Sequence, residues 1–68
     1  MENNYYKVLV MFQEGERVTR NRLLKLAGVT VELLDECVEQ GLLLEVDKTD
    51  IGEIRYIITE TGIAVRDN

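Results

Sequence analysis

The sequence predicts a small α+β domain with three helices, a two-stranded β-hairpin and a short C-terminal helix. Three observations support this prediction. Up to Gly41, apolar residues recur at the three-to-four-residue spacing of a buried helix face. Beyond Gly41 they alternate with polar residues, which is the period of a half-buried strand. The five glycines fall where these patterns end, and no proline interrupts them.

The first helix is predicted to start after Asn3 or Asn4, either of which can serve as its N-cap, and to end at Gly15. Its buried face has the spacing i, i+3, i+4 and i+7 and consists of Tyr5, Val8, Leu9 and Phe12. Three further apolar residues lie outside this face, namely Tyr6, Val10 and Met11. Either two neighbouring elements pack on this helix, or the three residues form the seam of a homodimer.

The second helix is predicted over residues 20–27, with Thr19 as its N-cap and Gly28 as the residue that ends it. The isolated apolar residue before the cap, Val18, is compatible with a short strand. The inward residues of the helix are predicted to be Leu23, Leu24 and Ala27.

The third helix is predicted to follow Thr30 as its N-cap and to end at Gly41. Its first turn contains Glu32, where the helix dipole favours an acidic side chain. The predicted buried face consists of Val31, Leu34, Cys37 and Val38. The position of Cys37 favours a small buried residue, with a reactive thiol as the alternative.

The alternation of Leu42, Leu44 and Val46 predicts one strand, and the β-branched and aromatic residues at 54–59 predict its partner. A polar loop of about six residues joins them, in which Gly52 supplies a turn or bulge position. Thr59 is predicted to cap the C-terminal helix. The candidate packing residues of that helix are Ile63, Ala64 and Val65.

Composition excludes several function classes. A single cysteine cannot form an internal disulfide, and without histidine there is no Cys/His set for a zinc site. The common nucleophile–base pairs are absent for the same reason. The many carboxylates are interpreted as solvated helix faces rather than acid–base pairs, and the scattered glycines form no phosphate-binding loop. We therefore expect no enzyme, no catalytic residue, no metal and no cofactor.

The sequence also bears on location and stability. No signal peptide is recognisable, and no apolar stretch approaches the roughly 20 residues of a membrane span. We therefore expect a cytoplasmic protein that does not bind membranes. A chain of 68 residues buries only roughly 60% of the surface that its unfolded form exposes, so a partner would add stability.

Two motifs make the chain resemble a known family. The first is LLKLAGVT at 23–30, followed by GLL at 41–43, which is similar to a helix-turn-helix whose recognition helix ends on a glycine and an apolar strand. The second is YIITETG at 56–62, which is similar to the Tyr-x-x-Thr-x-x-Gly signature that closes the wing of many bacterial and archaeal regulators. Residues 1–68 thus resemble a single winged helix-turn-helix domain.

This resemblance implies a small transcription regulator that binds double-stranded DNA and forms a homodimer through its first helix. The cations available for phosphate contacts are Arg17, Arg20, Arg22, Lys25 and Lys48. Thr30, at the tip of the third helix, would lie near the bases with the helix dipole behind it. The other interpretation of these cations is an ordinary solvated face, partly paired with acids of the third helix.

The third helix departs from the family pattern. Members of the family usually direct polar or basic side chains from this helix into the DNA groove, whereas here the polar positions include Glu32, Asp35, Glu36 and Glu39. The whole chain also has a net charge of −5, which repels nucleic acid at long range. The alternative to the regulator is a protein–protein interaction module, such as an adaptor or inhibitor that docks through the third helix, because a domain with a basic second helix and an acidic third helix also suits charged protein partners.

Overall fold

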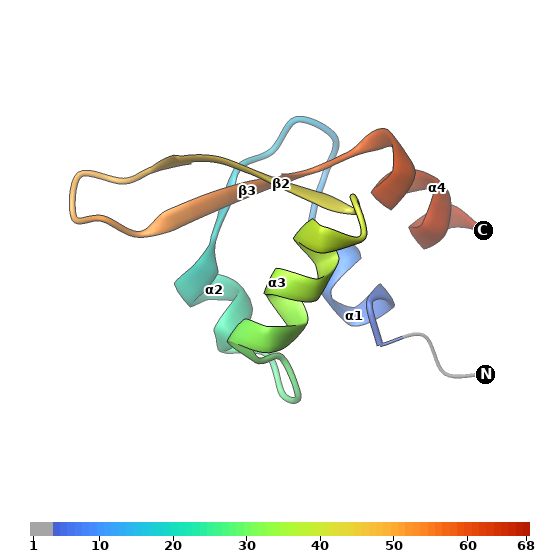
Figure 1. Ribbon diagram of the computed structural model, residues 1–68, viewed down its shortest axis with the longest axis horizontal. Helices are drawn as coiled ribbons and strands as arrows, with labels where there is room; N and C mark the ends of the chain where they lie inside the picture. Colours follow the sequence, from blue (N-terminus) through green and yellow to red (C-terminus); the bar gives the residue numbers. More distant parts are fainter. Residues whose placement is uncertain (1–3) are drawn as a thin grey trace.

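The computed structural model describes residues 4–68 and shows a small α+β fold with four helices and three strands in that range (Figure 1). The predicted α+β class is therefore confirmed. Asn3, one of the two predicted caps of the first helix, lies outside the described residues. In chain order the elements are α1 (Tyr6–Leu9), β1 (Val18–Thr19), α2 (Arg20–Leu24), α3 (Val31–Glu39), β2 (Leu43–Lys48), β3 (Ile54–Ile58) and α4 (Glu60–Asp67).

The three strands form one antiparallel sheet in the order β1-β3-β2. β2 and β3 pair as the predicted hairpin, with a register shift between Glu45 and Asp47. β1 adds a two-residue strand on the other side of β3, which confirms the short strand at Val18. The hairpin loop at 49–53 contains Gly52, whose φ of 85° is a conformation that glycine adopts without strain.

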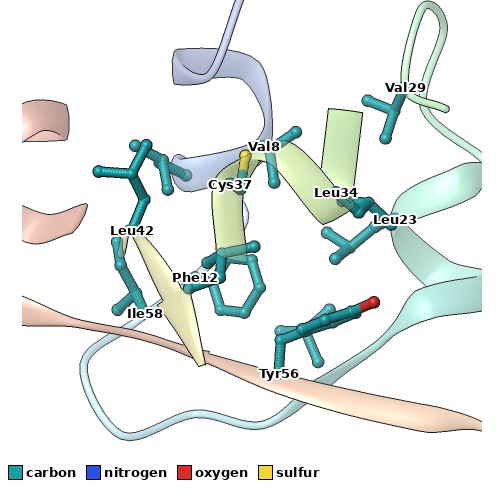
Figure 2. Packing of buried hydrophobic residues seen from close by; sticks show 12 residues of the cluster. Val8, Phe12, Leu23, Val29, Leu34, Cys37, Leu42, Tyr56 and Ile58 are labelled. Atoms are coloured by element: carbon teal, nitrogen blue, oxygen red, sulfur yellow. The ribbon is translucent and has the colours of Figure 1, made fainter. Parts of the chain in front are cut away.

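One hydrophobic core lies between the sheet and the helices α1, α2 and α3, which pack against one face of the sheet (Figure 1). Figure 2 shows side chains from these helices and from the strands meeting in this core. No polar or charged residue is buried within residues 4–68, so apolar burial supplies the driving force for packing. The buried residues are Val8, Leu9, Phe12, Val18, Leu23, Val29, Leu34, Cys37, Leu42, Leu43, Tyr56 and Ile58.

The first helix is much shorter than the sequence predicted. α1 spans only the four residues Tyr6–Leu9, and its N-cap position is Tyr5, which makes no side-chain cap bond. After α1 the backbone tightens, since the amide of Met11 bonds to the carbonyl oxygen three residues earlier at 3.1 Å. Bonds of this kind commonly end a helix. Gly15, predicted as the helix end, instead has a φ of 80° in a separate turn.

The three predicted threonine caps are confirmed. Each hydroxyl oxygen accepts a hydrogen bond from the backbone amide three residues later, at 3.3 Å for Thr19, 3.1 Å for Thr30 and 3.0 Å for Thr59. A cap of this kind satisfies an amide that has no partner inside the helix. The starts of α2, α3 and α4 are therefore local features of the sequence.

Three predicted packing positions are wrong, and the helix geometry explains each of them. α2 ends before residue 25, so Ala27 is exposed and half-buried Leu26 packs on the core in its place. Val31 is 37% exposed, because the first turn of α3 lies at the margin of the core. Ala64 is exposed on α4, which packs instead through its half-buried residues Ile63 and Val65.

The end of α3 is a Schellman motif built on Gly41, which has a φ of 76°. The amide of Gly41 bonds to the carbonyl oxygen of Val38 at 3.0 Å, and the amide of Leu42 bonds to that of Cys37 at 2.9 Å. These two bonds satisfy carbonyls that the helix leaves without partners and lead the chain directly into β2. The predicted helix stop at Gly41 is confirmed.

The motif at 56–62 has a structural explanation at each of its fixed positions. Tyr56 is fully buried on β3, and Thr59 caps α4. Gly62 packs so closely on the start of β2 that a Cβ atom there would overlap the carbonyl oxygen of Leu42. The motif therefore fixes how α4 sits against the junction of α3 and β2.

Candidate functional site

The outward face of α3 carries a continuous row of carboxylates, which we call the acidic stripe. Its members follow the spacing i, i+3, i+4 and i+7, which places them on one side of a helix. All four are exposed, and α3 contains no Lys or Arg. The acidic stripe consists of Glu32, Asp35, Glu36 and Glu39.

Two carboxylates of the acidic stripe contact neighbouring elements. Asp35 lies 3.5 Å from the guanidinium of Arg20 on α2. Glu36 accepts a hydrogen bond of 2.5 Å from the hydroxyl of Tyr5, and this bond raises the pKa of Tyr5. Glu32 and Glu39 make no ion pair within residues 4–68, so their charges face solvent uncompensated.

Arg20, a predicted phosphate contact, is engaged inside the fold. Its Nε donates a hydrogen bond of 2.9 Å to the hydroxyl of Tyr56, and its guanidinium carbon lies 5.9 Å from the centre of that ring. The hydrogen bond to Tyr56 raises the pKa of Arg20, and the carboxylate of Asp35 raises it further. Figure 2 shows the Tyr56 hydroxyl at the edge of the core, on the side of α2. Arg20 thus joins α2, α3 and β3.

Arg17 is also opposed by a carboxylate, because its Nε lies 3.9 Å from Asp47 on β2. Asp47 in turn accepts two hydrogen bonds from Arg55 on β3, at 2.6 and 2.8 Å. These bonds hold the pKa of Asp47 below its usual range. The positive charge of Arg17 is therefore partly compensated by the hairpin.

The other three predicted phosphate contacts, Arg22, Lys25 and Lys48, are exposed and make no ion pair within residues 4–68. Arg22 and Lys25 are three residues apart at the end of α2, whereas Lys48 lies at the far end of β2. The predicted set of five cations is thus divided into two that face carboxylates and three that do not. Thr30 is exposed, and its hydroxyl already serves as the cap of α3.

Some contacts around this region were not predicted from the sequence. The Nζ of Lys7 lies over the turn between α2 and α3, where a Cβ on Gly28 would be 2.9 Å from it. Asn21 on α2 donates a hydrogen bond to the carboxylate of Glu53, the last residue of the hairpin loop. Both contacts join residues that are far apart in the sequence, so no local pattern indicates them.

Of the three residues predicted to form a dimer seam, the structure leaves two exposed and one half-buried. Tyr6 and Val10 are exposed on α1, in agreement with the surplus of apolar residues there. Met11 is half-buried and packs on the core. For this residue the structure therefore favours the first of the two interpretations, in which the extra apolar residues of the first helix pack against neighbouring elements.

The described residues add two findings on chemistry. Cys37 is fully buried, and burial raises the pKa of its thiol to about 11. Both findings favour the predicted small buried residue over a reactive thiol. Residues 4–68 contain no group of three or more His, Cys, Asp or Glu side chains that could hold a metal ion. Within the same range, no helix is long and apolar enough to cross a membrane.

No family model matches this chain, and neither does any curated protein or solved structure.

Proposed function

We propose that this chain is a winged-helix protein-interaction module that binds a positively charged segment of another protein through the acidic stripe. The observation that carries the proposal is the arrangement of Glu32, Asp35, Glu36 and Glu39 on one exposed helix face without a cation on α3. A Lys- or Arg-rich partner would meet carboxylates at regular spacing along about two turns of helix.

Electrostatic magnitudes favour a cationic partner over DNA at this face. A carboxylate about 4 Å from a phosphate is repelled by about 4 kcal/mol at the effective dielectric of a protein surface. One good base contact contributes about 1–3 kcal/mol of discrimination, so it does not offset several such repulsions. The same field attracts a basic partner and increases its association rate.

The second candidate function is DNA binding by a small transcription regulator. It is favoured by Arg22, Lys25 and Lys48, whose charges are not compensated within residues 4–68. In this mode α2 and the hairpin would contact phosphates, and only Thr30 at the tip of α3 would approach the bases. We place it second because Arg17 and Arg20 already face carboxylates.

A peptide selection tests the first function. Random peptides displayed on phage are selected on the immobilised protein, and the enriched sequences are synthesised and titrated by fluorescence anisotropy. We expect sequences rich in Lys and Arg, whose binding weakens with salt. The variant Glu39→Lys should weaken binding by about tenfold or more, because it reverses one charge of the stripe. It leaves the contacts of Asp35 and Glu36 intact.

The matched control is Glu16→Lys, which makes the same charge change at an exposed position outside the acidic stripe. Peptides that bind the wild type and Glu39→Lys equally would rule out the acidic stripe as the binding face. The same proteins are titrated against a mixed-sequence DNA duplex at low salt. Duplex binding that Arg22→Ala and Lys25→Ala weaken would support the regulator, and absence of duplex binding would eliminate it.

A further inference from the structure

We draw no further inference here: the strongest candidate, the outer face of the sheet where exposed Leu44 of β2 lies directly opposite half-buried Ile57 of β3, is an apolar face for which nothing in residues 4–68 shows what covers it.

Discussion

The hydroxyl oxygen of Thr59 lies 2.6 Å from the carbonyl oxygen of Gly41 and donates a hydrogen bond to it. The same oxygen accepts a hydrogen bond of 3.0 Å from the amide of Gly62, and the Thr59 amide donates to the carbonyl oxygen of Leu42 at 3.1 Å. One residue thus caps the start of α4 and satisfies a carbonyl at the end of α3. This arrangement explains why a short chain can hold α4 in a fixed position.

Thr59→Val should lower the free energy of unfolding by about 1–3 kcal/mol, because it removes the cap and leaves the Gly41 carbonyl without this donor. Urea unfolding followed by circular dichroism measures the change. Thr59→Ser keeps the hydroxyl and should recover most of the loss. The control Thr61→Val makes the same substitution at an exposed position of α4 and should change stability by less than about 1 kcal/mol.

Gly62→Ala tests the close packing of α4 on the start of β2. Helix propensity alone would stabilise the variant by about 1 kcal/mol. The new Cβ would overlap the carbonyl oxygen of Leu42 and lie 2.8 Å from a side-chain carbon of Ile58, and overpacking of this kind costs about 1–3 kcal/mol. We expect a net loss of stability in urea unfolding. Thr61→Ala adds no atom and lies at an exposed position of α4, so it should be neutral or stabilising. A Gly62→Ala variant that gains stability would disprove the close contact.

Local signals in the sequence predicted much of this fold. The caps at Thr19, Thr30 and Thr59 and the stop at Gly41 depend on bonds between residues at most five positions apart, so a pattern can reveal them. The change from helical to alternating spacing predicted the hairpin in the same way. The first helix was predicted too long because apolar spacing does not reveal where the backbone tightens after Leu9.

The arrangement of charges could not be predicted, because it depends on contacts between distant segments. Arg20 and Tyr56 are 36 positions apart, and Tyr5 and Glu36 are 31 apart. Only the fold shows that Arg20 is used internally whereas Arg22, two residues later, is not. The acidic stripe itself was evident in the sequence, since it requires only the period of one helix.

Arg20→Ala should lower the free energy of unfolding by about 1–3 kcal/mol, because it leaves the hydroxyl of buried Tyr56 without its donor. Arg22→Ala, at an exposed position of the same helix, should change it by less than about 0.5 kcal/mol. A loss of DNA binding on Arg20→Ala alone would therefore not identify a phosphate contact. Thermal and urea unfolding of both variants measure the difference.

A double-mutant cycle separates the hydrogen bond of Arg20 from its other contacts. Tyr56→Phe removes the hydroxyl, so it should cost less stability in the Arg20→Ala background than in the wild type. Strictly additive losses would show that the two side chains are not coupled, and the stability that Arg20 supplies would then come from its other contacts, such as that with Asp35.

Asp47→Asn should reveal an ion pair that depends on pH. The hydrogen bonds from Arg55 hold the pKa of Asp47 in the folded chain below its unfolded value, which is about 3.9 for an aspartate. A carboxyl with a lowered folded-state pKa stabilises the fold above its unfolded pKa, and this contribution is lost as the pH falls toward the folded pKa. The wild type should therefore be more stable than Asp47→Asn at pH 7, and the difference should shrink below about pH 4.

Urea unfolding of both proteins at a series of pH values measures this stability difference. The control is Asp50→Asn, which removes the same charge from an exposed loop position without removing the hydrogen bonds between Arg55 and Asp47. If the stability difference between the wild type and Asp47→Asn stays the same in strong acid, the charge of Asp47 is not its cause. Asp47 is protonated and uncharged under those conditions, so the difference would then come from the packing of its side chain.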